Sequence, residues 1–472
     1  MTSPRGRRSP SKQTQSQSRR PRTARHLAYE AVAAWRDRGV YAGLVIDDIC
    51  REHEITRSDR AMAMEITYGV IRRQATLDAV ISAFVDRPRS HVENGLWTLL
   101  QIGAYQVLMM DGVPAHAAVG ETVQVAKSLR RPEWTGLLNG VLRKLSKSVR
   151  DADVVNMSAD RVPIDATRSK QLDRCVFPDP SSSTIEHLAK AYSYPRWLVR
   201  DWSERLGTDE TVRLCHWFNS PPLITIRVNL PRQSPEVVRE VLKASGVEVA
   251  PGEWQESLRL MNSARIGELP GFAEGWFSVQ DESAMSAGHL LDPQPGDHIL
   301  DLCAAPGGKT THLAELMRDE GEIVALDTDE VRLSRIAENA SRLGLSSIRC
   351  QQISPDGHDI PPGPFDRVLV DVPCSNTGVL GKRPEARWRI TPEDITELSA
   401  LQRRLLQQAL DRVKPGGGVV YSTCSIDPRE NQQVVSTVLG QYEDVELMKE
   451  IEHQPGQPSD GGYQALLRRA NV

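Results

Sequence analysis

The first part of the chain places apolar residues at the spacing of amphipathic helices. Between residues 24 and 150 they recur every three or four positions, so that each set lies on one helix face. Two sets show this: Leu96, Leu99, Leu100, Gly103, Val107 and Leu108, then Val119, Thr122, Val123 and Ala126. Breaks fall at Gly39, Pro88 and Pro114. We therefore expect residues 24–150 to form an all-α domain.

The pattern changes twice in the middle of the chain. Residues 151–185 are polar, lack periodicity and end in Pro-Asp-Pro-Ser-Ser-Ser, which indicates a linker. Residues 186–218 return to helical spacing, and 223–229 form an alternating β-branched run typical of a strand. With a helix at 234–245 and shorter strands after it, residues 186–280 are expected to be helical and then a small α+β insert.

From residue 281 to 472, short apolar runs alternate with helical stretches. The strand candidates are His298–Cys303, Ile323–Asp327, Arg367–Asp371 and Gly418–Ser422, and the helices between them fall at 309–318, 329–343 and 392–413. Such alternation predicts a Rossmann-like, doubly wound α/β domain with a parallel sheet. Its ligand is expected at the carboxyl ends of the strands.

Length and composition agree with a soluble, multidomain α and α/β protein. A chain of 472 residues suggests three domains, at roughly 150 residues each. No apolar run approaches the ~20 residues of a membrane helix, and no signal peptide precedes the first helix. Seven cysteines are too few, and odd in number, for a disulfide framework, which favours a cytoplasmic protein with free thiols.

The net charge of −4 argues at first sight against a nucleic-acid partner. However, residues 1–150 hold 24 Lys or Arg against 14 Asp or Glu, a balance of +10, and residues 151–472 carry −14. Residues 127–150 alone hold seven basic residues and one acid. With eight basic residues among the first 26, residues 1–23 are expected to be a disordered basic tail, either a solvated leader or a weak RNA tether.

A glycine-rich turn joins the first C-terminal strand to its helix in the segment ILDLCAAPGGKTT, residues 299–311. Gly307 and Gly308 let a ligand approach the backbone, and the helix N-terminus offers free N–H groups. A phosphate-binding P-loop would need glycine where Cys303 stands, and the dinucleotide motif G-x-G-x-x-G is absent. S-adenosyl-L-methionine is the third candidate.

Two aspartates extend this candidate cofactor site. Asp327 ends the next strand, where a carboxylate can accept both ribose hydroxyls. Asp356 follows the third strand in Pro-Asp-Gly, where it is placed to face the adenine. The alternatives are a strand-end cap for Asp327 and an ordinary turn residue for Asp356.

Two cysteines follow neighbouring strand candidates, in Asp371-Val-Pro-Cys374 and in Ser422-Thr-Cys424. Both strand ends face the same crevice, so the thiols are expected to converge. C5 of cytosine is a poor nucleophile, and a thiolate that adds to C6 makes C5 carbanion-like. A carboxyl group beside N3, such as Asp371, stabilises that charge while C5 attacks a sulfonium methyl group. Spacing alone does not decide which thiol is the nucleophile.

The motifs at residues 301–310, 371–375 and 422–425 together resemble those of the Sun/Fmu (RsmB-like) RNA cytosine-C5 methyltransferases. Further similarity lies at residues 225–229, 279–284 and 460–463, and at 114–119 and 137–143, which resemble a NusB-like domain. The resemblance spans roughly residues 24–470. It implies an RNA-binding NusB-like domain at 24–150, an RNA-contacting insert and a catalytic domain at 281–472.

The resemblance also implies roles for single residues. The nucleophile of the family is the Thr-Cys cysteine, here Cys424, and Cys374 then assists release of the enzyme–RNA adduct. Asp371 matches a residue near the base and the methyl donor, and Lys309 reaches toward the active site. The implied cofactor positions are Cys303, Ala304, Ala305, Pro306, Gly307, Gly308, Lys309, Asp327, Asp356 and Asp371.

A basic loop follows the Pro-Cys motif. It contains Lys382, Arg383, Arg387 and Arg389. We interpret it as an RNA-backbone contact, with Trp388 either a stacking ring or an ordinary packing residue. Val372, where the family usually has alanine, changes only packing.

The expected function is methylation of C5 of a cytosine in small-subunit (16S) ribosomal RNA, with S-adenosyl-L-methionine as cofactor. We expect a monomer that needs neither a metal nor a membrane. A tRNA cytosine-C5 methyltransferase and a non-catalytic RNA-binding assembly factor stay open as alternatives.

Overall fold

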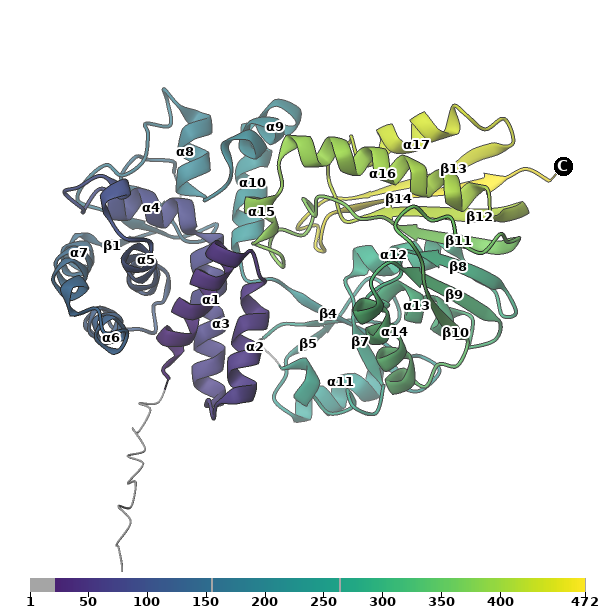
Figure 1. Ribbon diagram of the computed structural model, residues 1–472, viewed down its shortest axis with the longest axis horizontal. Helices are drawn as coiled ribbons and strands as arrows, with labels where there is room; N and C mark the ends of the chain where they lie inside the picture. Colours follow the sequence, from purple (N-terminus) through teal and green to yellow (C-terminus); the bar gives the residue numbers. More distant parts are fainter. Residues whose placement is uncertain (1–21, 154–155, 263–264, 472) are drawn as a thin grey trace, which may run out of the picture. The chain divides into compact units, whose positions relative to one another are not determined.

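The computed structural model describes residues 22–153, 156–262 and 265–471, and the chain divides into two compact units at Val149 and Arg150 (Figure 1). The basic tail expected at residues 1–23 therefore lies almost wholly outside the described residues. Among the helices of the described ranges, none is both long and apolar enough to cross a membrane.

The N-terminal unit is built from helices, as the apolar spacing predicted. Its α-helices are α1 (Ala24–Arg38), α2 (Ala42–Glu52), α3 (Arg57–Arg72), α4 (Gln74–Ser82), α5 (Asn94–Met109), α6 (Ala115–Ser128) and α7 (Thr135–Ser148). Helix α5 is central, because 12 of its 16 residues are buried. Gly69 of α3 lies against the Tyr105 ring of α5, where any Cβ would collide, so this glycine permits close helix packing.

The second unit opens with a small sheet where we expected an irregular linker. Strands β1 (Arg150–Ala152), β3 (Ser169–Gln171) and β2 (Arg161–Pro163) pair antiparallel in that order. Strands of three residues are too short for alternation to show in a sequence. The expected helical stretch follows as α8 (Thr184–Ala191), α9 (Arg196–Leu206) and α10 (Thr208–Asn219).

The α+β insert has a four-stranded antiparallel sheet and one helix (Figure 1). The strand order is β5 (Val249–Pro251), β6 (Ser257–Leu260), β4 (Ile224–Val228) and β7 (Phe277–Val279). Helix α11 (Pro235–Ala244) is capped by the Ser234 hydroxyl, which accepts from the Val237 amide, and buries Val238 and Leu242 against the sheet. This matches the expected helix at 234–245.

The C-terminal sheet has seven strands. Their order is β10 (Ile348–Gln352), β9 (Glu322–Asp327), β8 (His298–Leu302), β11 (Phe365–Asp371), β12 (Val413–Thr423), β14 (Gly462–Arg469) and β13 (Val445–His453). The first five are parallel, and β14 and β13 add an antiparallel hairpin. The doubly wound prediction is confirmed, and the hairpin makes the sheet mixed.

Helices cover both faces of this sheet, and the period of two in each strand decides which side chain meets which helix. On one face, Leu300 and Val370 pack with α16 (Pro392–Leu410) and α17 (Gln432–Leu439). On the other, Ile299 and Leu369 pack with α12 (Glu282–Leu291) and α13 (Gly308–Leu316). Helix α14 (Glu330–Leu343) packs against Ala304 and Ala305 through Leu333 and Ile336. Burial on both faces explains why these strands read as continuous apolar runs.

A buried ion pair joins the insert to helix α13, which follows the glycine-rich turn. Arg227 of β4 is fully buried and donates to both carboxylate oxygens of Glu315 on α13, at 2.8 Å each. The same guanidinium donates to the Gly308 carbonyl at 2.8 Å and to the Thr311 hydroxyl at 3.1 Å. Bidentate pairing of this kind fixes geometry as well as charge. Arg227 thus holds the first turn of α13 in place.

Candidate active site

The two thiols meet because β11 and β12 are parallel neighbours in register. Asp371, the last residue of β11, pairs with Ser422 of β12, so Cys374 and Cys424 emerge side by side at one edge of the sheet. Their sulfur atoms lie 3.2 Å apart. The predicted convergence of these two cysteines is confirmed.

The surroundings of the two thiols differ in charge. The pKa of the Cys424 thiol is lowered, first by a hydrogen bond from Cys374 and then by the positive charges of Arg383 and Lys309. The same hydrogen bond and burial raise the pKa of Cys374. Cys424 is therefore the thiol that ionises more readily, as a nucleophile must.

Asn376 orients this pair from the turn after Cys374. Its φ of 60° is in the left-handed region, which asparagine tolerates better than most residues. Its amide donates to the Cys374 carbonyl at 2.8 Å, and its Oδ1 accepts from Arg383 at 2.6 Å. The Cys424 thiol lies 3.3 Å from the same Oδ1. The sequence analysis missed Asn376, although Ser-Asn-Thr-Gly after a cysteine is a turn signal.

Lys309 and Asp371 form an ion pair beside the thiols. The Lys309 ammonium lies 2.7 Å from Asp371 Oδ2, and both side chains are largely shielded from solvent. Burial acts to lower the pKa of Lys309, but the Asp371 carboxylate outweighs it and raises that pKa. The pair brings the loop at residues 303–309 and the end of β11 together, a contact that the sequence analysis did not predict.

The cofactor loop has the shape that a ligand at the backbone requires. Cys303 and Gly307 have φ values of 62° and 97°. A Cβ on Gly307 would lie 3.1 Å from Ile336, whereas a Cβ on Gly308 would meet no atom within 4 Å. The loop is thus packed on one side and open at the first turn of α13. The residues fit a small ligand with an anionic end at this helix N-terminus.

Asp327 is buried at the end of β9, where it also supports the loop. Its Oδ2 accepts from the Ala305 amide at 3.2 Å, and its Oδ1 from the Asp329 amide at 3.1 Å. A carboxylate can accept further hydrogen bonds at both oxygens, so this support leaves room for ribose hydroxyls. Asp356 instead lies in an exposed loop, where a hydrogen bond from His358 lowers its pKa to about 2. Its adenine contact stays a prediction.

Asp301 is a buried carboxyl group beneath the site. The Thr310 hydroxyl donates to its Oδ2 at 2.7 Å, and its buried Oδ1 has no hydrogen-bond partner among the described residues. Burial raises the pKa of Asp301 to about 7, in spite of the Thr310 hydrogen bond and with help from the Asp371 charge. The neutral form of Asp301 is therefore the one that the fold favours.

This burial gives a pH-dependent effect on stability. Because the folded pKa lies above the unfolded value, the contribution of Asp301 to stability falls as the pH rises from about 4 to about 7. Asp301→Asn mimics the neutral form at every pH. We expect it to raise the melting temperature of the cofactor-free protein at pH 8 and to change it little at pH 4, measured by calorimetry. An equal shift at both pH values would contradict this, and Asp86→Asn, at an exposed site, is the control.

Only part of the basic loop at residues 382–389 is exposed, whereas the sequence analysis interpreted the whole loop as an RNA-backbone contact. Arg387 is fully buried and donates to the Ser193 carbonyl and to Asn219 Oδ1, at 3.1 and 2.9 Å. Lys382 pairs with Asp281 and Asp460, at 2.6 and 2.8 Å. The RNA interpretation is wrong for Arg387, because the loop packs onto α10 and buries that side chain. Trp388 is half-buried, and Arg389 is exposed.

A second polar cluster lies between the insert and the catalytic helices. Glu256 Oε1 accepts from His289 on α12 at 2.6 Å and lies 3.3 Å from His312 Nε2 on α13. These three residues have ligand atoms close enough for a metal ion. Burial lowers the pKa of His312 to about 3, so this side chain is neutral. Its contact with Glu256 connects helix α13 to the insert.

The chain matches three protein families in succession. They are described as "NusB family" over residues 22–147, "Methyltr_RsmF/B-like, ferredoxin-like domain" over 194–266, and "16S rRNA methyltransferase RsmB/F" over 288–468.

Relatives match over nearly the whole length. The "Probable ribosomal RNA small subunit methyltransferase B" of Synechocystis sp. is 37% identical over 89% of this chain and 90% of its own. The "Ribosomal RNA small subunit methyltransferase B" of Klebsiella pneumoniae is 33% identical over 94% of each chain. The crystal structure of PH0851 superposes with a TM-score of 0.76 at 27% identity, covering 94% of this chain and 98% of that one.

Proposed function

The chain belongs to the RsmB/F family of 16S rRNA methyltransferases, and on this premise we propose that it methylates C5 of a cytosine in small-subunit ribosomal RNA through a covalent Cys424–C6 adduct. The observation that carries the proposal is the thiol pair, 3.2 Å apart, beside the Lys309–Asp371 ion pair. A non-catalytic assembly factor would have no use for two thiols that converge beside this ion pair.

The methyl donor is S-adenosyl-L-methionine, which supplies an electrophilic sulfonium methyl group when it is bound. The loop from Cys303 to Lys309 would receive its amino-acid end, since the first turn of α13 is open above Gly308. Asp327 would accept the ribose hydroxyls, and Asp356 would face the adenine.

The chain's own residues account for activation of the base. The Cys424 thiolate adds to C6, and the displaced electron pair moves toward C5 and N3. As the pyrimidine enters, Asp371 would take a proton from the adjacent Lys309 ammonium, and its O–H would then donate a hydrogen bond to N3 and stabilise that charge. After C5 has been methylated, a base takes the C5 proton, the C5–C6 double bond re-forms and the C6–S bond electrons return to Cys424. Cys374, which stays protonated, would donate a hydrogen bond to the departing sulfur and stabilise it as the thiolate.

RNA binding is assigned to the NusB-like unit and the ferredoxin-like insert. The balance of +10 in residues 1–150 supports this, because lysine and arginine neutralise backbone phosphates. The target cytosine must leave its stack to reach the recessed thiols, so we propose that it is flipped into the site. Affinity for RNA should then fall with rising salt.

Bisulfite sequencing of RNA from a strain without this gene tests the function. We expect one cytosine of the small-subunit RNA to lose protection from conversion and to regain it when the wild-type gene is restored. Loss of protection in tRNA alone would instead favour the tRNA alternative. Unchanged protection in both RNA fractions would contradict methylation of C5.

A further inference from the structure

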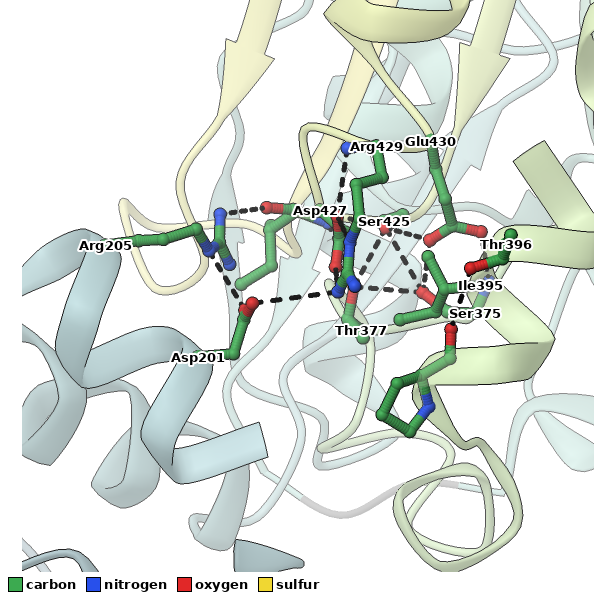
Figure 2. Close-up of polar contacts among 12 residues, drawn as sticks. Asp201, Arg205, Ser375, Thr377, Ile395, Thr396, Ser425, Asp427, Arg429 and Glu430 are labelled. Carbon is green, nitrogen blue, oxygen red and sulfur yellow. Dashed lines mark hydrogen bonds and ion pairs between the residues drawn. The ribbon is translucent and has the colours of Figure 1, made fainter. Parts of the chain in front are cut away.

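One buried carboxylate contacts the turns of both cysteines. Glu430 lies at the turn before α17, and its side chain is completely buried. Figure 2 shows this side chain directed at Ser375 and Ser425, the residues that follow Cys374 and Cys424 in the sequence. Glu430 accepts hydrogen bonds from both serine hydroxyls at Oε2, the one from Ser425 at 2.5 Å.

The other oxygen of the carboxylate strengthens this connection. Oε1 accepts from the Ser375 backbone amide at 2.8 Å and from Gln402 of α16 at 3.0 Å. Gln402 also donates to the Pro373 carbonyl at 2.8 Å, so the Cys374 residue is held on both sides. Four donors on two oxygens occupy the full acceptor capacity of an ionised carboxylate.

The main chain of Glu430 is fixed to the sheet. The buried Tyr421 hydroxyl of β12 donates to the Glu430 carbonyl at 2.5 Å. Thr377 adds a link between the two turns, because its hydroxyl lies 2.9 Å from Ser425 Oγ and accepts from the Ile426 amide at 3.1 Å. Glu430 is thus a rigid bridge between the turn after β11 and the turn after β12.

Glu430 is not placed to touch a substrate. It has no exposed surface, and its hydrogen bonds to the active-site turns go to the serines, not to the sulfur atoms. Its hydrogen bonds therefore act on the reaction through the positions of the two turns, and its charge adds to the causes that raise the pKa of Cys374. A displacement of about 1 Å in such a site can cost about a hundredfold in rate.

We propose that Glu430 is a positioning residue, which bridges the two cysteine turns and thereby sets the distance between the Cys374 and Cys424 thiols. The consequence for catalysis rests on the proposed function, because a fixed distance matters if one thiol attacks and the other assists release. The bridge itself does not depend on the reaction.

The rate of oxidation by diamide reports on the distance between the two thiols. Diamide takes two electrons and two protons from them as they form a disulfide. Substitutions of Glu430 separate length from charge. Glu430→Gln keeps the length, and its amide can donate to the two hydroxyls while its oxygen still accepts from Ser375 and Gln402. Glu430→Asp keeps the charge but is one methylene too short to reach both turns.

Asn431 provides a matched control. It is also buried, and it accepts from Thr423 at 2.7 Å and donates to the Ser425 carbonyl at 3.0 Å, so its side chain contacts only the Cys424 turn. Asn431→Ala removes buried hydrogen bonds from one turn and leaves the bridge intact.

We expect Glu430→Asp to form the Cys374–Cys424 disulfide about tenfold more slowly than the wild type. Peptide mapping of the protein, alkylated at successive times, measures the rate. Glu430→Gln and Asn431→Ala should stay within about threefold of the wild type. In a single-turnover assay Glu430→Asp should also slow methyl transfer, with the dissociation constant for S-adenosyl-L-methionine unchanged.

Two results would overturn the proposal. One is a wild-type oxidation rate in Glu430→Asp, and the other is an equal slowing in all three variants, which would indicate general destabilisation. The oxidation assay needs no RNA and no methyl transfer. The oxidation assay would therefore still test the role of Glu430 if the proposal of C5 methylation failed. Wild-type methylation together with unaltered oxidation in Glu430→Asp would refute the positioning role of Glu430 and leave the proposed function standing.

Discussion

Replacing Cys424 with alanine is expected to reduce methyl transfer below about one-thousandth of the wild-type rate. In the proposed mechanism C5 becomes nucleophilic only after Cys424 adds to C6. The neighbouring Cys374 does not replace it, because its pKa is raised whereas that of Cys424 is lowered. S-adenosyl-L-methionine should still bind with unchanged affinity, since Cys424 lies on the β12 turn and not in the loop from Cys303 to Lys309. Transfer of a tritiated methyl group and isothermal titration measure the two quantities.

Controls make this result specific to one thiol. Cys175→Ala alters an exposed cysteine outside the site and should transfer methyl groups at the wild-type rate. If Cys424→Ala kept its activity while Cys374→Ala lost it, Cys374 and not Cys424 would be the nucleophile.

The parallel sheet could be predicted because its strands are buried on both faces. A strand such as β8 has no polar side to interrupt the apolar run, and its end coincides with the start of a glycine-rich turn. Strand β13 was not predicted as a separate element, since an edge strand with mostly exposed side chains has no apolar signal. Strand β12 begins at Val413, five residues earlier than expected, because Pro415 and three glycines hide it.

The candidate site was predictable as far as motif residues mark strand ends. Cys374, Cys424, Asp371 and Lys309 do lie together, because strand order and register brought separate motifs to one edge. Residues that support these four side chains from other parts of the chain lie in no recognisable motif. Glu430 and Gln402 look like ordinary polar residues of a turn and a helix, and their role appears only from burial and contacts. Arg387 shows the opposite error: its charge led to the prediction of an RNA contact, although the side chain is buried by packing.

Replacing Cys374 with alanine is expected to trap the enzyme on its RNA. The Cys374 sulfur lies 3.2 Å from Cys424, and its raised pKa keeps it protonated, so it is placed to donate to sulfur as the C6–S bond breaks. Without that hydrogen bond to the departing thiolate, addition and methyl transfer can proceed, but release slows. With labelled RNA and S-adenosyl-L-methionine, Cys374→Ala should give a shifted band that survives denaturing gel electrophoresis.

The double variant Cys374→Ala with Cys424→Ala supplies the control for this band. It should form no adduct, because the thiol that bonds to C6 is gone. The rate of adduct formation in Cys374→Ala should also fall at pH 7, since Cys424 loses the hydrogen bond that is the first cause of its lowered pKa. Raising the pH restores the Cys424 thiolate and should restore that rate, whereas release should stay slow. Multiple turnover by Cys374→Ala without a stable band would rule out a role in release and leave Cys374 as a group that only tunes its neighbour.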